Sequence, residues 1–94
     1  MKNDKFVFSN AVFKEDKGYS SLCLDLDVAS QGGTVAEAKK NLLEAIDLYL
    51  ETAIESNLPY MRPVSPAEDP RRSKISNCVE IFDLKVALSI KAHA

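Results

Sequence analysis

This 94-residue sequence is poor in the residues on which much enzyme and metal chemistry depends, with one histidine and two cysteines. Cys23 and Cys78 form no CxxC-like pair and are too few for a disulfide framework, so we interpret both as small apolar residues. His93 lies near the C-terminus, and Ser-His-Asp or Cys-His catalysis therefore has no base in the body of the chain. The sequence predicts no catalytic residues, no metal site and no cofactor.

Long hydrophobic runs and an excess of positive charge are absent as well. No stretch approaches the roughly 20 apolar residues of a bilayer-spanning helix, and no apolar region of a secretory signal follows the charged residues 1–5. Twelve lysines and arginines against 14 acidic residues give a formal net charge of −2, which disfavours non-specific nucleic-acid binding. Gly32-Gly33 lacks the spacing and the lysine of a phosphate-binding loop. These features fit a cytoplasmic protein with a basic protein partner.

The strongest local signal is the stretch 32–38 with the helical pattern that follows it. Thr34 is a favourable N-cap residue, and Glu37 lies three positions later, where a capping-box carboxylate reaches back to the backbone N–H of the cap. The two glycines before Thr34 let the chain turn sharply from a strand into a helix. The pattern predicts an amphipathic helix from Thr34 to about Asn57, roughly 35 Å long at 1.5 Å per residue. In a small domain such a helix needs a flat apolar surface, which a sheet supplies.

The apolar side of this predicted helix is wide, because a second row of apolar residues runs beside the main one. Packing on the sheet accounts for most of these apolar residues. We also hypothesise that the second row forms an oligomer interface. The main row is Val35, Ala38, Leu42, Ile46, Tyr49 and Ala53, and the second row, the predicted interface, is Leu43, Leu50 and Ile54.

Three β-type segments precede the helix. Residues 6–14 are rich in aromatic and β-branched side chains, and a turn over 15–18 ends at Gly18, which is free to take a positive φ. Residues 19–26 alternate, and residues 28–31 form a short third segment. The alternation in the second segment predicts Leu22, Leu24 and Leu26 on one face and Cys23, Asp25 and Asp27 on the other.

All four prolines lie between residues 59 and 70, and proline is excluded from helix interiors and central strands. We therefore predict a surface connection over 59–77. Residues 78–90 return to β-type sequence, with a phase shift near Phe82-Asp83 that predicts a bulge or the end of a strand. The basic residues of the connection, interpreted as a solvated loop or as partner contacts, are Arg62, Arg71, Arg72 and Lys74.

The order β-β-β-α-β predicts one domain over residues 1–94. Its core is expected over about residues 5–58, completed by a final strand over 78–90. Runs of strands with one long helix are typical of the α+β class, here two layers with the helix packed on one face of an antiparallel sheet.

Several segments resemble the HicB family of antitoxins. Gly18-Tyr19 opens the second strand, residues 24–27 (LDLD) lie where the family has an acidic "PDL" segment, and residues 31–38 (QGGTVAEA) resemble its "GDT-x-x-EA" helix entry. The prolines after the helix resemble the family's helix exit. The resemblance covers residues 6–66, with 79–84 as the final strand. Leu24 and Gly33 depart from the family pattern, which usually has proline and aspartate there.

The resemblance implies a partial RNase H-like fold and a non-enzymatic role. A HicB antitoxin binds and neutralises a HicA-type toxin, a small basic RNA-cleaving protein, by occluding its active surface. Many members carry a C-terminal DNA-binding module. Only ten residues follow Leu84 here, so we expect no direct DNA binding.

Asp25 and Asp27 share a predicted strand face, for which three interpretations stand. The face is simply solvated, or it contacts a protein partner, or it belongs to a two-metal nuclease centre. Spacing places no further carboxylate beside the two aspartates, and the resemblance implies an inactive version of the fold. Tyr19 and Tyr49 are either half-buried residues or contact residues. The predicted partner-binding residues are Tyr19, Asp25, Asp27 and Arg62.

The leading functional hypothesis is an antitoxin-like binding domain, itself homo-oligomeric. The alternative is an orphan homo-oligomeric HicB-like domain with a scaffold or small-ligand role and no toxin partner. A neighbouring reading frame for a short basic protein with one histidine would favour the antitoxin, and its absence would favour the orphan domain.

Overall fold

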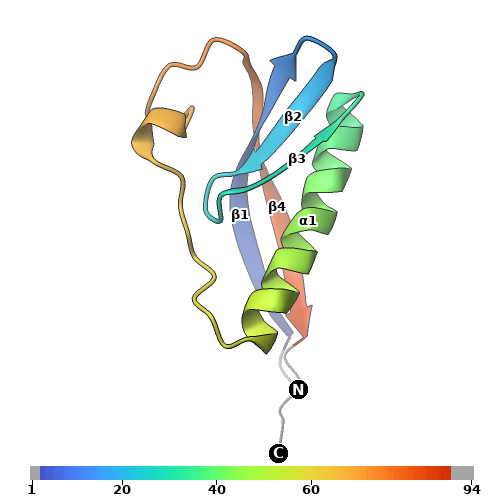
Figure 1. Ribbon diagram of the computed structural model, residues 1–94, viewed down its shortest axis with the longest axis vertical. Coiled ribbons are helices and arrows are strands. Elements are labelled where there is room, and N and C mark those ends of the chain that lie inside the picture. Colours follow the sequence, from blue (N-terminus) through green and yellow to red (C-terminus); the bar gives the residue numbers. More distant parts are fainter. Residues whose placement is uncertain (1–2, 90–94) are drawn as a thin grey trace, which may run out of the picture.

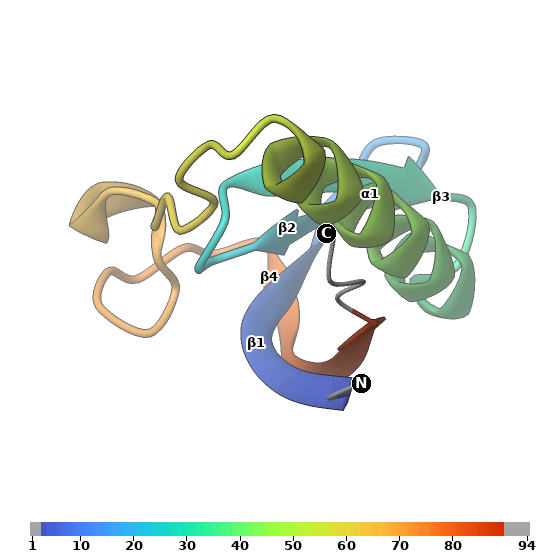
Figure 2. The same cartoon turned by 90° about the horizontal axis from the view of Figure 1, so that it is seen from below.

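The computed structural model describes residues 3–89. Its four strands form one antiparallel sheet in the order β3-β2-β1-β4, and the single α-helix lies across one face (Figures 1 and 2). The predicted two-layer α+β architecture is confirmed. In chain order the elements are β1 (Asn3–Glu15), β2 (Gly18–Cys23), β3 (Val28–Gly32), α1 (Val35–Glu55), a 3-10 helix (Pro66–Glu68) and β4 (Cys78–Ser89).

The main core lies between α1 and the sheet. The helix packs chiefly on β3 and β2, and its inward face follows the predicted spacing of three and four residues. Removing these apolar side chains from water is the main force that holds the helix on the sheet. The buried members of this cluster are Leu42, Ile46 and Leu50 from the helix with Phe8, Cys23, Leu26 and Val86 from the rest of the chain.

A second cluster fills the opposite face of the sheet. Ala11 and Phe13 of β1 point away from the helix, since they alternate with the inward residues of that strand, and they pack with Leu24. Val64 and Ile75 of the connection 59–77 close over them. The connection therefore covers one end of this face and is part of the packed structure.

Both ends of α1 agree with the sequence prediction to within two residues. Thr34 is the N-cap, and its side-chain oxygen accepts a hydrogen bond from the backbone N–H of Glu37 at 3.1 Å. The Glu37 carboxylate accepts from the Thr34 hydroxyl at 3.4 Å instead of reaching the backbone N–H of the cap, so the predicted reciprocal half of the capping box does not form. Ser56 is the C-cap, and Asn57 follows with φ of 53°.

The prediction for the second strand was wrong beyond Cys23. Residues 24–27 form a turn, in which the backbone N–H of Asp27 donates to the carbonyl of Cys23 at 2.9 Å and Asp27 has φ of 54°. Leu24 enters the second cluster and Leu26 the main core. The leucines are buried because the turn folds over the end of the sheet, and Asp25 and Asp27 therefore share no strand face.

The bulge in β4 also lies elsewhere than predicted. β4 pairs with β1 without a shift from Ser89 to Glu80, including Phe82 and Asp83, and the register changes only where Val12 and Phe13 face Glu80 and Cys78. The apparent phase shift arises because both faces of β4 carry apolar side chains. Phe82 and Leu84 pack against the main core, while Val79 and Ile81 are exposed. Residue 90 lies outside the described residues.

The hairpin between β1 and β2 confirms the predicted turn. β1 ends at Glu15 and begins at Asn3, three residues before the predicted start, and β2 begins at Gly18. Gly18 has φ of +111°, a conformation that side chains other than glycine rarely adopt.

Candidate partner-binding surface

The fold gathers three of the four predicted partner-binding residues at one end of the sheet. Asp25 and Asp27 lie on the turn 24–27, and residues 62–64 run beside it, while residues 58–61 lead there from the end of α1. The N–H of Arg62 donates to the carbonyl of Asp25, and the N–H of Val64 donates to the carbonyl of Leu24, both at 3.0 Å. We call the exposed part of residues 24–27 and 58–62 the turn surface.

Asp25 is a structural carboxylate of this surface. Its Oδ2 accepts a hydrogen bond from the backbone N–H of Ser9 at 2.8 Å, and the carbonyl of Ser9 accepts one from the N–H of Leu24 at 2.8 Å. Asp25 is half-buried. These bonds hold the turn against β1, so one oxygen of the Asp25 carboxylate already has a hydrogen-bond partner within the chain.

Asp27 and Arg62 are exposed and present opposite charges on the same surface. The Arg62 guanidinium lies over the ring of Tyr49, with Cζ 5.7 Å from the ring centroid. The Tyr49 hydroxyl donates to the carbonyl of Tyr60 at 2.8 Å. Half-buried Tyr49 thus supports the segment that carries Arg62, which limits the freedom of an otherwise solvated side chain.

Two apolar residues of this surface were missed at the level of the sequence. The side chains of Leu58 and Met61 are 58% and 55% exposed, respectively. Exposed apolar groups bordered by charged ones mark protein–protein contact sites more often than isolated apolar residues do. The available signal was the pair of apolar residues flanking Pro59 and Tyr60, of which Leu58 ends the predicted core range 5–58 and Met61 lies in the predicted connection 59–77.

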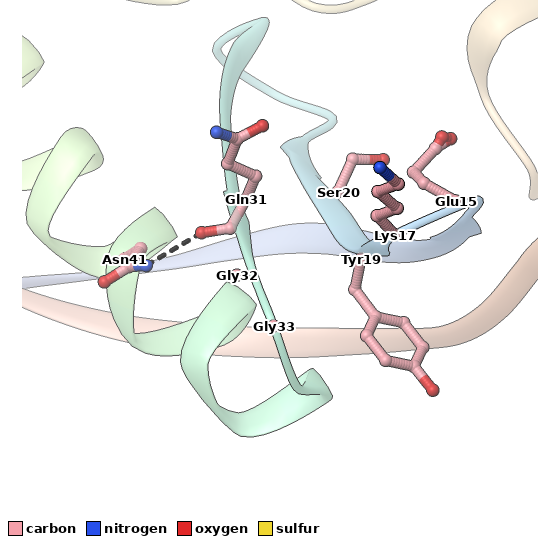
Figure 3. Close-up of a pocket in the computed structure, with 8 residues that line it drawn as sticks. All are labelled: Glu15, Lys17, Tyr19, Ser20, Gln31, Gly32, Gly33 and Asn41. Carbon is pink, nitrogen blue, oxygen red and sulfur yellow. Dashed lines mark hydrogen bonds between the residues drawn. The ribbon is translucent and has the colours of Figure 1, made fainter.

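Tyr19 lies at the other end of β2, apart from the turn surface. Its ring lies under the ammonium of Lys14, with Nζ 4.8 Å from the centroid. It borders an open depression of about 440 Å³ at the junction of β3 and α1, shown in Figure 3. There the Asn41 Nδ2 donates to the carbonyl of Gln31 at 2.7 Å. Tyr19 therefore contributes to a different surface from the other three predicted residues.

The three residues of the predicted oligomer interface are placed differently. Leu50 is fully buried in the main core and offers no area to a second copy. Leu43 is partly buried against the same core, and Ile54 is 37% exposed. The second row of the helix is mainly a core-packing feature, and an interface through Leu43 and Ile54 stays a prediction.

The basic residues after Pro70 are used partly within the chain. Asp69 is 4% exposed, and its carboxylate accepts from Arg71 Nε at 3.0 Å and Nη2 at 2.9 Å. Arg72 Nε lies 4.0 Å from the same carboxylate. The hydrogen bonds that Arg71 donates to the Asp69 carboxylate lower the pKa of Asp69 below its ordinary value and raise the pKa of Arg71. This cluster holds the loop after the 3-10 helix together.

The described residues contain no group of three or more His, Cys, Asp or Glu side chains placed to hold a metal ion. Cys23 and Cys78 are free thiols, and burial raises the pKa of the Cys23 thiol. His93 lies outside the described residues. Within residues 3–89, no helix is long and apolar enough to cross a membrane.

The arrangement defines a class of small α+β domain: a three-stranded meander, a covering helix, and a fourth strand beside the first. Solved structures share this arrangement. A chain of the HicA3 and HicB3 toxin–antitoxin complex is 24% identical with a TM-score of 0.62, over 83% of this chain and 94% of that chain. The N-terminal domain of the Burkholderia pseudomallei antitoxin HicB is 25% identical with a TM-score of 0.56, over 93% of this chain and all of that one.

These structures confirm the resemblance to HicB inferred from the sequence, and the fold is that of a HicB antitoxin N-terminal domain. No protein-family model matches the sequence, and no curated protein matches it either.

Proposed function

We propose that this protein is a cytoplasmic, non-enzymatic antitoxin domain that neutralises a small HicA-type RNA-cleaving toxin by covering its active surface. The observation that carries the proposal is the structural likeness to the HicB N-terminal domain, which extends over 93% of this chain. A structure of similar fold comes from a complex of HicA3 with HicB3.

The turn surface is our candidate for the contact with the toxin. Leu58 and Met61 would supply apolar area that a partner removes from water, and such burial sets the lifetime of a complex. The net charge of −2 would attract a basic toxin and speed the encounter. Asp27 and Arg62 would then orient the partner, while Asp25 would act by holding the turn in place.

The test is neutralisation of the toxin in cells. The product of a neighbouring reading frame that encodes a short basic protein with one histidine would be expressed alone and together with this chain. We expect growth arrest by that product alone and recovery on co-expression. Absence of binding between the two purified proteins would contradict the antitoxin function and favour the orphan domain.

A matched pair of variants tests the turn surface separately. Met61→Glu places a charge in the proposed contact and should raise the dissociation constant of the complex at least tenfold, equivalent to about 1.4 kcal/mol. Leu48→Glu is the control, since Leu48 is 67% exposed on α1. Equal effects of the two substitutions would place the contact elsewhere while leaving the antitoxin function intact.

A further inference from the structure

The two edges of the sheet differ in how they are protected. β3 is five residues long, and the carbonyl of Gln31 already accepts a hydrogen bond from Asn41. β4 is 12 residues long and lies at the other end of the strand order, with β1 on its inner side (Figure 1). Its only irregularity within the described residues is the shift beside Glu80 and Cys78. A long regular edge strand without proline is a ready template for another strand.

We propose that β4 pairs antiparallel with β4 of a second copy of this chain, about a two-fold axis at Leu84, to form a continuous eight-stranded sheet. This goes beyond the proposed function and requires no toxin. In such a dimer Leu84 faces the second Leu84, Phe82 faces Val86, and Asp83 faces Lys85, the last two pairs occurring twice by symmetry.

Charge selects this register. Asp83 and Lys85 are both exposed, and in β4 they project from the same face, since they are two residues apart. Directly opposed side chains in an antiparallel pair interact, favourably for opposite charges and unfavourably for like charges. Centring the axis on Asp83 opposes two aspartates, and centring it on Lys85 opposes two lysines. Only the axis at Leu84 brings each Asp83 opposite a Lys85.

The apolar residues of the other face fit the same register. Phe82 and Leu84 are half-buried against the main core and have a neighbouring strand on one side only, that of β1. The Lys39 ammonium of α1 lies 4.7 Å from the centroid of the Phe82 ring, so Leu84 is the residue that a second strand would mainly cover. A second β4 would cover the outer side of Leu84 with the second Leu84, which opposes it directly in this register. Val86, opposite Phe82, is buried in the main core and adds apolar neighbours without a charge. The same register therefore pairs opposite charges on one face of β4 and apolar side chains on the other.

Charge reversal with rescue tests the proposal on the full chain. Within the chain Lys85 pairs with Val7 and Asp83 with Ser9, so neither has a charged cross-strand partner to lose. The dissociation constant of the dimer would be measured by sedimentation equilibrium, against a chain mass of 10.4 kDa. Lys85→Asp and Asp83→Lys should each raise that constant roughly tenfold. The double variant Asp83→Lys/Lys85→Asp should return it to the wild-type range. Glu44→Lys, on the exposed side of α1, is the control and should change nothing.

Thermal unfolding would establish that each variant is folded, which matters for Asp83 because its charge acts on Arg71 of the same chain. Amide exchange provides a second readout, since backbone N–H groups of β4 should exchange more slowly as protein concentration rises. Sedimentation of the wild-type protein as a monomer at all concentrations would overturn the proposal. A dimer unaffected by the single substitutions, or not restored in the double variant, would overturn it as well.

Discussion

The carboxylate of Asp25 accepts a hydrogen bond from the backbone N–H of Ser9 at 2.8 Å, across 16 residues of sequence. This bond joins the turn after β2 to the middle of β1. It explains why two aspartates separated by one residue have different roles, because Asp25 is half-buried and bonded while Asp27 is exposed.

Asp25→Ala should lower the free energy of unfolding by about 1–2 kcal/mol, since it leaves the Ser9 N–H without its charged acceptor at a partly solvated site. Asp27→Asn should change it by less than about 0.5 kcal/mol, because Asn tolerates the left-handed backbone at that position. Urea unfolding of both variants measures the difference. Equal losses would show that the Ser9 bond contributes little.

Gly32→Ala should destabilise the protein by about 2–3 kcal/mol through overpacking. A Cβ at Gly32 would lie 2.5 Å from the backbone nitrogen of Ala38 and 2.7 Å from Glu37 Cβ, in the first turn of α1. The neighbouring Gly33→Ala is the matched control, because its Cβ meets only Glu37 Oε1, at 3.4 Å. Its cost should stay within about 1 kcal/mol. Thermal melts of the two variants measure the difference. A loss for Gly33→Ala as large as that for Gly32→Ala would show that the close approach of β3 to α1 at Gly32 is not what requires glycine there.

The Asp69–Arg71 pair predicts a pH dependence of stability. Because the pKa of Asp69 is lowered in the folded chain, its stabilising contribution is complete above the ordinary aspartate pKa of about 3.9 and is lost as pH falls through the folded value. Asp69→Asn should cost about 1–2 kcal/mol at pH 7, since Arg71 is partly solvated. The gap from wild type should shrink below about pH 4. A gap that stays constant down to pH 2 in denaturant titrations would contradict this assignment.

The two cysteines should differ in reactivity towards a thiol reagent. Cys23 is fully buried and burial raises its pKa, whereas Cys78 is half-buried. Because the thiolate is the reacting form, the native protein should show one fast thiol, and the second should appear only on unfolding. Mass spectrometry after brief alkylation identifies which cysteine is modified. Rapid labelling of Cys23 would show that the core opens readily.

The helix and the hairpin could be predicted because their signals are local. The Thr34 cap, the three- and four-residue spacing of Leu42, Ile46 and Leu50, and the glycine at position 18 each act within a few residues of the chain. The prediction of a strand through residues 24–26 was wrong because it also used only local pattern. An alternating pattern of leucines is equally compatible with a strand and with a turn whose leucines enter two different clusters.

The candidate site was predicted in part. Asp25, Asp27 and Arg62 came together, but through hydrogen bonds between segments more than 30 residues apart, which no periodicity encodes. Leu58 and Met61 were missed because the sequence does not show whether an apolar residue after the helix is buried or exposed. That depends on which other segments pack against it. Leu50 was predicted to lie at an oligomer interface although it is buried in the core. The apolar pattern of the helix does not show how much of its surface the sheet covers.

The sequence by itself determined the class of fold, the helix with its N-cap and the hairpin turn, because these depend on interactions between near neighbours and on the period of apolar residues. Only the tertiary structure decided that Asp25 holds the turn, that Leu58 and Met61 are exposed on the segment leading to it, and that β4 is an edge strand of the sheet formed by residues 3–89. Those outcomes depend on which distant segments meet and which surfaces remain uncovered once the strands have paired.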